Sequence, residues 1–169
     1  MDITELILFQ HYEQNRAFAL LDDIARDDSK RLAVVWSRLV VALEVHAAAE
    51  EKFFYPRLLE VGKGAGGETL TGEVKDAIKD HNEIREGIRT AAKHEVGSDA
   101  WWDAVEETRK ANGDHVGEEE REDLPDFRRN AGLQLRHDVA LEFIAYESEH
   151  AQGITPKDKD PEKYVKQGG

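Results

Sequence analysis

The sequence contains no cysteine, which excludes disulfides, thiolate metal sites and a thiol nucleophile, and it gives no sign of an oxidising compartment. It also lacks a secretory signal, because the N-terminal Met-Asp-Ile-Thr-Glu has neither a basic nor an apolar region. The most apolar run, residues 32–43, is interrupted by Arg38 and is too short to span a bilayer. These absences predict a cytoplasmic protein without a membrane partner.

Positive charge is scarce as well. With 36 acidic residues against 23 Lys and Arg, the formal net charge is −13. Phosphate binding needs clustered basic side chains, so nucleic acid is not an expected partner. Proline and glycine number only 4 and 13, whereas 40% of the residues are hydrophobic and 35% are charged. This composition is typical of a soluble helical protein, and the length fits one domain.

What the sequence does contain is a repeat built on histidine. Residues 46–51 read His-Ala-Ala-Ala-Glu-Glu, residues 115–120 read His-Val-Gly-Glu-Glu-Glu, and each reaches a proline ten residues after its histidine. Each copy follows another histidine, His11 or His81, so the four histidines are spaced by 35, 35 and 34 residues. The constant offset of 69 or 70 residues between the copies indicates a duplicated helix pair.

The periodicity of apolar residues predicts five helices. Their expected bounds are 3–27, 30–60, 70–94, 99–122 and 131–151, with the duplicated pairs at 3–60 and 70–122. Residues 62–68 form the flexible linker between the pairs, and 152–169 form a flexible polar tail with little to bury. Four long helices with short connections favour an all-α antiparallel up-down four-helix bundle, within one domain over residues 1–151. The additional C-terminal helix packs outside it or serves self-association, which leaves a homodimer open.

Two features predict departures from regular helices. Pro56 removes a backbone donor and is expected to kink or tighten the end of the second helix. Gly113 and Gly117 lie on the side of the fourth helix opposite His115, where they would allow close approach of the fifth helix. Alternatively the fourth helix is simply weaker there, because each glycine costs about 1 kcal/mol relative to alanine.

Six residues carry the predicted chemistry. A histidine and a glutamate four positions apart lie on one helix face, so each pair can aim at one point. All six lie on the inward stripes of their helices, where unpaired carboxylates would each cost several kcal/mol. Two divalent or trivalent cations would neutralise them, with both carboxylates bridging. The expected metal ligands are His11, His46, Glu50, His81, His115 and Glu119.

The blander interpretation is that such histidines are core residues and such pairs are surface pairs, but two copies in register argue against it. Imidazole and carboxylate without thiolate suit iron, with Mn or Zn as less distinctive substitutes. The remaining histidines, His94, His137 and His150, are assigned to surface or capping roles, with an approach of His137 to the site left open. His-Glu-x-x-His is absent, which disfavours a zinc protease.

These elements resemble the hemerythrin-like family, also called HHE cation-binding domains, over about residues 5–130. The resemblance is carried by the six predicted ligands, by the second glutamates Glu51 and Glu120, and by Pro56 and Pro125. It implies a four-helix bundle that holds an oxo- or hydroxo-bridged non-haem di-iron centre on those six residues. Members of the family carry oxygen, sense oxygen or iron, repair iron centres in response to nitric oxide, or decompose peroxide.

Departures from the family pattern narrow the expected function. Oxygen carriers of this family have a second histidine on the third helix, one turn after the first. This chain has Arg85 at that position. Fewer protein ligands leave more open coordination positions, so we expect an oxidoreductase in oxidative stress, most simply one that decomposes peroxide like a catalase or peroxidase. The alternative is reversible binding or sensing of O2 or NO, or iron storage or sensing, without turnover. A purely structural metal site is the weakest interpretation.

Several side chains near the predicted site could not be placed by sequence. Arg85 could pair with an acid or face solvent, and any of Tyr12, Tyr55 and Tyr146 could approach the metals. Aromatic residues follow the glutamate of the first copy, whereas acidic residues, Glu122 among them, follow that of the second. We therefore expect one dry and one acidic end. The acidic end either relays protons or conducts iron, or is merely an exposed helix end.

Overall fold

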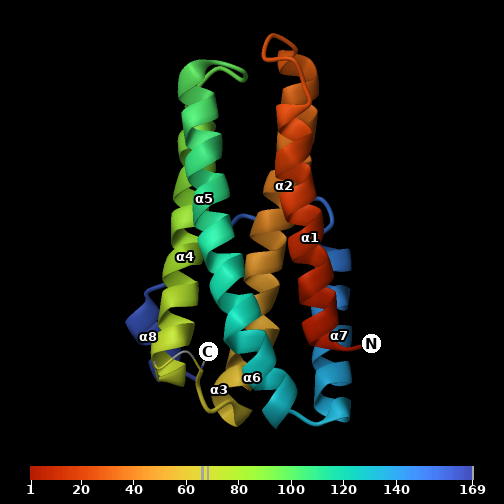
Figure 1. The fold of residues 1–169 in the computed structure, drawn as a ribbon, viewed down its shortest axis with the longest axis vertical. Helices are drawn as coiled ribbons and strands as arrows, with labels where there is room; N and C mark the ends of the chain where they lie inside the picture. Colours follow the sequence, from red (N-terminus) through yellow and green to blue (C-terminus); the bar gives the residue numbers. More distant parts are fainter. Residues whose placement is uncertain (66, 68, 169) are drawn as a thin grey trace.

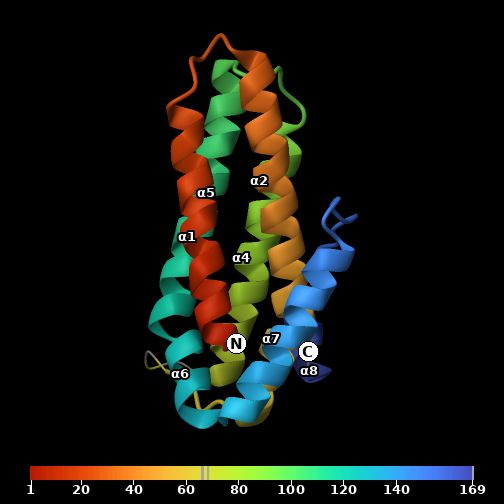
Figure 2. The same cartoon turned by 90° about the vertical axis from the view of Figure 1, so that its right-hand side faces the viewer.

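The computed structural model describes residues 1–65, 67 and 69–168, and within them it contains helices and no strand. The four long helices run side by side along the long axis of the molecule (Figure 1 and Figure 2). They are α1 (Ile3–Asp22), α2 (Ser29–Ala49), α4 (Leu70–Ala91) and α5 (Asp99–Arg121). Consecutive long helices alternate in direction, because the α1–α2 and α4–α5 turns lie at one end and the α2–α4 connection lies at the other (Figure 1). The all-helical class is confirmed.

Shorter elements complete the described part of the chain. They are the π-helical η1 (Glu50–Phe54), α3 (Tyr55–Val61), α6 (Asp123–Asn130), α7 (Leu133–Glu149) and α8 (Pro161–Lys166). The second predicted helix therefore consists of α2, η1 and α3, and the additional C-terminal helix is α7. Of the predicted linker 62–68, residues 66 and 68 lie outside the described residues.

Each long helix begins at a side chain that caps it. Asp2, Asp28, Thr69 and Ser98 each accept a hydrogen bond from a backbone N–H in the first turn of α1, α2, α4 and α5. Such a cap satisfies a donor that the helix itself cannot, and is worth about 1 kcal/mol. These short polar residues thus set where each inward stripe begins.

The proline of each repeat copy interrupts its helix. Proline lacks an N–H and clashes with the carbonyl four residues earlier, so a regular α-helix cannot continue unchanged through it. Before Pro56 the chain adopts the five-residue π-helix η1, in which the N–H of Tyr55 bonds to the carbonyl of Glu50. Before Pro125 the helix instead breaks at Glu122, where φ is −120° and α5 ends. Prolines at equivalent positions of the repeat therefore produce two different irregularities, each close to a predicted ligand.

Two apolar clusters fill the bundle, one towards each end. The cluster near the α1–α2 and α4–α5 turns includes Phe18, Leu21, Leu32, Trp36, Leu39, Leu43, Ile84, Ile88, Trp101 and Val105. The cluster near the α2–α4 connection includes Ile3, Ile7, Phe54, Leu58, Val74, Ile78, Leu124, Phe127, Val139 and Phe143. The predicted ligands lie between these two clusters along their helices, so apolar packing on both sides holds the polar centre in place.

Helix α7 packs against α1, α2 and η1 rather than against α5. A Cβ at Gly113 would meet nothing within 4 Å, and one at Gly117 would meet only a side-chain nitrogen of Arg121 from its own helix. The prediction that these glycines admit the C-terminal helix is therefore wrong. The apolar residues Val139, Ala140 and Phe143 of α7 are instead buried in the apolar cluster near the α2–α4 connection, which decides where the helix docks.

The segment after residue 152 differs from the flexible polar tail expected from sequence. Residues 161–166 form α8, which begins at Asp160 as N-cap with Pro161 in the first turn and packs on α4. The side chain of Tyr164 is 6% exposed and belongs to the apolar cluster near the α2–α4 connection. A single aromatic ring with a capped turn is enough to dock this short helix, although its composition is polar.

By length and composition alone, the helical stretch Ser29–Val61 is apolar enough to cross a membrane. The core helix of a water-soluble protein passes the same test, and here 44% of the most apolar window is buried inside the bundle. The stretch also carries His46 and Glu50, which lie buried in the polar centre.

Candidate metal centre

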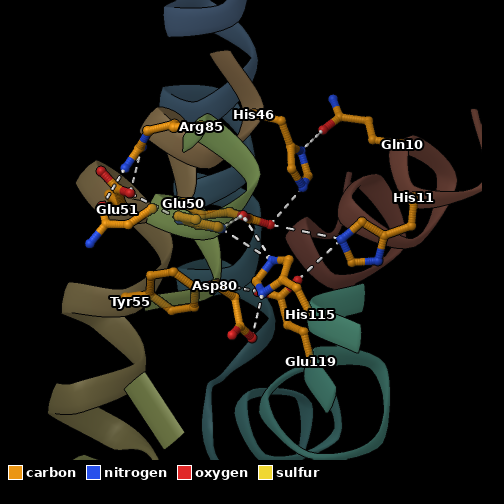
Figure 3. A network of polar contacts seen from close by, with 12 residues as sticks. Gln10, His11, His46, Glu50, Glu51, Tyr55, Asp80, Arg85, His115 and Glu119 are labelled. Atoms are coloured by element: carbon orange, nitrogen blue, oxygen red, sulfur yellow. Dashed lines mark hydrogen bonds and ion pairs between the residues drawn. The ribbon is translucent and has the colours of Figure 1, made fainter. Parts of the chain in front are cut away.

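The six predicted ligands meet in the middle of the bundle, and none is more than 4% exposed. They come from α1, α2, η1, α4 and α5, so every long helix contributes at least one (Figure 3). Each side chain points towards a common point between the helices. The residues are His11, His46, Glu50, His81, His115 and Glu119.

Glu50 lies between two pairs of histidines. Its Oε1 is 2.7 Å from Nε2 of His46 and 3.9 Å from Nε2 of His11. Its Oε2 is 3.2 Å from Nε2 of His81 and 3.8 Å from Nε2 of His115. In each half, one Glu50 oxygen and two imidazole nitrogens lie within 4.8 Å of one another, close enough to share a cation. Glu50 is thus placed as a carboxylate that could bridge two ions.

Glu119 contacts a histidine of one half of the centre and a tyrosine. Its Oε2 lies 3.2 Å from Nε2 of His11, whereas its Oε1 accepts a hydrogen bond from the Tyr55 hydroxyl at 3.1 Å. Glu119 therefore faces the His11 half, and among the described residues only Glu50 has oxygens within 4.0 Å of imidazole nitrogens in both halves. The other carboxylate oxygen of Glu119 is held by the hydroxyl of Tyr55.

Five inward-facing atoms in this cluster have no hydrogen-bond partner among the described residues. They are Nε2 of His11, Nε2 of His46, both carboxylate oxygens of Glu50 and Oε2 of Glu119. Leaving a buried polar atom unsatisfied costs about 1–3 kcal/mol, and proteins rarely gather several at one point. Metal cations satisfy nitrogen and oxygen lone pairs together, and imidazole with carboxylate suits iron. The donor set therefore fits the predicted metals.

The outer nitrogen of each imidazole faces an oxygen acceptor. The Nδ1 contacts are His11 with Glu120 at 3.1 Å, His46 with Gln10 at 2.7 Å, His81 with Glu51 at 2.9 Å and His115 with Asp80 at 3.9 Å. Since these partners offer oxygen acceptors, they favour a proton on Nδ1 and leave the Nε2 lone pair facing inward. Such partners fix ring orientation and tautomer in metal sites.

These four partners extend the sequence repeat outwards. Glu51 and Glu120 are the second glutamates of the two repeat copies, and each holds the histidine of a different helix. Gln10 and Asp80 directly precede the first histidine of each half. Offsets of 69 and 70 residues relate the pairs, so this layer follows the same duplication as the ligands. Sequence analysis missed their role, although the repeat offset was the signal that could have found it.

The comparisons with known proteins agree with this geometry. A model of the hemerythrin HHE cation-binding domain matches residues 2–127. The chain belongs to the hemerythrin HHE family. No curated protein and no solved structure gave a match. The HHE match covers α1 to most of α6 and so includes the six inward residues, whereas α7 and α8 lie beyond it.

Glu51 is the most strongly held residue in the HHE domain's outer layer. Arg85 donates to its Oε1 at 2.7 Å, and Lys159 lies 3.2 Å from its Oε2. Tyr164 donates its hydroxyl to the Glu51 backbone carbonyl. Burial would raise the pKa of Glu51, but His81, Arg85 and Lys159 outweigh burial and lower the pKa to about 2. The open question on Arg85 is thereby resolved, since it is 2% exposed and pairs with an acid.

Two of the four histidines hold protons strongly when no metal competes. Burial lowers the pKa of His11, but the carboxylate of Glu119, 3.2 Å from its Nε2, outweighs burial and raises the pKa to about 9. For His81, the hydrogen bond with Glu51 and the charges of Glu51 and Glu50 likewise outweigh burial and raise the pKa to about 9. Burial, followed by the charge of His81, lowers the pKa of His115. Cations entering the site must therefore displace protons, which links metal affinity to pH.

The other three histidines lie away from the centre, and one of the three candidate tyrosines reaches it. His94 is exposed, His137 contacts the backbone of Met1, and His150 stacks on Tyr146. The approach of His137 to the site, left open above, does not occur. Tyr12 is 63% exposed, and Tyr146 stacks on His150. Of the three candidate tyrosines, Tyr55 is the one that contacts a predicted ligand, Glu119.

Two cavities of different character reach the centre. The apolar cavity, of about 410 Å³, lies between α1, α2 and the end of α7 and reaches His46 past aliphatic residues such as Leu39 and Val41. The acidic vestibule, of about 180 Å³, lies between α4, α5 and the start of α6 and reaches His115 and Glu119. The acidic end expected from sequence is present, and it opens on the centre.

Proposed function

We propose that this HHE domain holds two iron ions at the centre and that the pair reacts with a small oxidant. One observation carries the proposal: five buried polar atoms converge without hydrogen-bond partners, while the two oxygens of Glu50 face separate pairs of histidines. Each half would then serve one ion. The proposed ligands are His11, His46, Glu50, His81, His115 and Glu119.

The reaction we propose is peroxide decomposition of the catalase or peroxidase type. Two bound irons supply a two-electron redox couple. One peroxide takes up two electrons and two protons to give two waters, and a second releases the same number to give O2. The overall reaction of two peroxides therefore needs no external reductant. Six protein ligands shared by two ions leave coordination positions open for a small molecule. Arg85 stands where oxygen carriers have a further histidine, and because it is held on Glu51 it adds no ligand.

Two residues of the chain are suited to hold protons beside the reacting molecule. Burial, followed by the charge of Glu119, raises the pKa of the Tyr55 hydroxyl well above its usual range, so it remains a donor. On the other side, Asp80 lies 3.9 Å from Nδ1 of His115, and burial with neighbouring acidic charge raises its pKa to about 7. A carboxyl with that pKa can release and recover a proton near neutral pH.

The apolar cavity supports a small uncharged substrate. Its surface is mostly apolar, and its charged lining residues are of both signs, Glu13 and Glu147 with Arg16 and Arg38, so it has no excess charge that would attract an ion. Near its base, the side chain of Gln14 is 3% exposed and its Oε1 has no hydrogen-bond partner among the described residues. Gln14 lies one turn from His11 on α1, and its oxygen could accept a hydrogen bond from a peroxide hydroxyl.

The test is metal analysis followed by oxygen evolution from hydrogen peroxide. We expect two irons per chain in the loaded protein and oxygen release well above that of free iron. His46→Ala and Glu119→Ala should lose both iron and turnover, whereas His94→Ala, which changes an exposed histidine, should lose neither. A loaded protein that is no faster than free iron would exclude peroxide decomposition. A stable, reversible adduct with O2 or NO, without net consumption of oxidant, would favour the binding or sensing function.

A further inference from the structure

The acidic vestibule has a charge unlike the rest of the approach to the centre. Seven of its nine lining residues are aspartate or glutamate, and none is lysine or arginine. Its inner wall is formed by His115 and Glu119, so it leads directly to two of the proposed ligands. The apolar cavity on the other side, which reaches His46, is lined by aliphatic residues and by charged residues of both signs, such as Glu13 and Arg16. Of these two approaches, the vestibule is therefore the one with an excess of negative charge.

Asp123 distinguishes the vestibule from an ordinary acidic surface. Its side chain is 4% exposed, lines the cavity, and has an Oδ1 without a hydrogen-bond partner among the described residues. The break at Glu122 places it there, because α5 ends at Arg121 and α6 begins at Asp123. A carboxylate buried without a partner is costly unless a cation or a proton accompanies it.

The rim of the vestibule continues the same charge outwards. Glu118 is exposed, Glu122 is half-buried and Asp123 is buried, and all three line the cavity. Clefts lined by one sign of charge concentrate counter-ions and raise association rates by about 10–1,000-fold. Carboxylate oxygens are also the ligands that hydrated divalent cations accept without full dehydration. The rim and the buried carboxylate thus form a graded path from solvent to Glu119.

We propose that the acidic vestibule is an additional cation-binding site, which captures a hydrated divalent metal ion at Glu118 and Glu122 and delivers it past Asp123 to the centre. The ion is ferrous iron, and this assignment rests on the function proposed above. Bound there, the cation neutralises the unpartnered carboxylate of Asp123 until Glu119 and His115 take it up. The ion exchanges its oxygen and nitrogen ligands as it moves, and the protons that it displaces from the centre pass to solvent.

The test measures how fast the metal-free protein takes up ferrous iron. The protein is mixed anaerobically with ferrous ion, and unbound iron is trapped with a colorimetric chelator at successive times. Glu118→Gln/Glu122→Gln removes two rim charges. The matched control, Asp103→Asn/Glu107→Gln, removes two exposed charges from α5, away from the vestibule. Asp123→Asn tests the buried carboxylate separately.

We expect the rim variant to load about tenfold more slowly than the control at low ionic strength and to approach it at high salt. Asp123→Asn should stay slow at both salt concentrations, because buried charge is screened less. All should reach the iron content of the unmodified protein. Uptake at the control rate in both vestibule variants, or a lower final content, would overturn the transfer path alone. An unmodified protein that takes up no iron would overturn the proposed function as well.

Discussion

Oxygen Oε1 of Glu51 lies 2.9 Å from Nδ1 of His81, across the interface between η1 and α4. The same oxygen accepts a hydrogen bond from Arg85 at 2.7 Å. Glu51 thus holds the imidazole whose opposite nitrogen faces Glu50, and is itself held by a buried guanidinium. Through Lys159 and Tyr164 it also connects the centre to a segment beyond the family match.

Removal of the Glu51 charge should weaken the centre more than the equivalent change in the other half. We expect Glu51→Gln to lower iron affinity about 10–100-fold, because His81 loses its charged partner. It should also lower the free energy of unfolding by about 3–5 kcal/mol, because Arg85 stays buried without its counter-charge. Chelator competition and urea unfolding measure the two effects.

Glu120→Gln is the matched comparison, since Glu120 holds His11 in the same way but is 38% exposed. It should cost less on both measures, because water can reach the altered group. Equal losses in the two variants would show that the added contacts of Glu51 contribute nothing.

The hydrogen bond from Tyr55 to Glu119 should be detectable in the metal-free protein. Tyr55→Phe leaves Oε1 of the buried carboxylate without its donor, so we expect a loss of about 1.5–3 kcal/mol in unfolding free energy. Tyr12→Phe, at a 63% exposed position, should stay within about 0.5 kcal/mol of the unmodified protein. Urea unfolding of both variants checks this, and similar stabilities for the two would contradict the assignment.

The metal-free protein should lose stability as pH rises from about 7 to 9. Both His11 and His81 have pKa values raised from 6.5 to about 9, so their stabilising protons are present below pH 6.5 and are lost through pH 9. Asp80, whose pKa is about 7, loses its proton mainly below pH 8, so the decrease between pH 8 and 9 reports chiefly on the two histidines. We expect a decrease on the order of 1–3 kcal/mol over that range.

Urea unfolding at a series of pH values provides the measurement. His11→Gln/His81→Gln should show little dependence above pH 7, whereas His94→Gln should follow the unmodified protein. Iron affinity should change in the opposite direction and rise with pH, because binding displaces the same protons. A flat stability profile in the unmodified metal-free protein would contradict the protonation scheme.

The C-terminal segment should depend on one aromatic ring. Tyr164→Ala removes the buried side chain that anchors α8, at a cost of about 3 kcal/mol in docking, or about a 100-fold larger undocked population. Trypsin should then cut after Lys159 and Lys163 far faster, without faster cleavage within α1. Tyr12→Ala, on the bundle surface, should leave cleavage unchanged. Equal protection of the segment in the Tyr164 variant would show that α8 docks by other contacts.

Much of the candidate site followed from local sequence rules. Helical periodicity and the four-residue spacing within His46–Glu50 and His115–Glu119 place these side chains on inward faces whatever the details of packing. A repeat offset of 69 or 70 residues then relates two halves, so the all-helical class, the family and the inward cluster could be predicted without coordinates. Those properties depend on residues close together in the chain or on a repeated pattern.

Only the tertiary structure decided what those side chains touch across helices. The contacts of Glu50 with His11, His81 and His115, the tie of Glu119 to Tyr55, and the pairing of Arg85 with Glu51 join residues 30 or more positions apart. The docking of Tyr164 on residues more than a hundred positions earlier is of the same kind. No spacing rule encodes such contacts, because they depend on the rotation and depth at which separately formed helices pack.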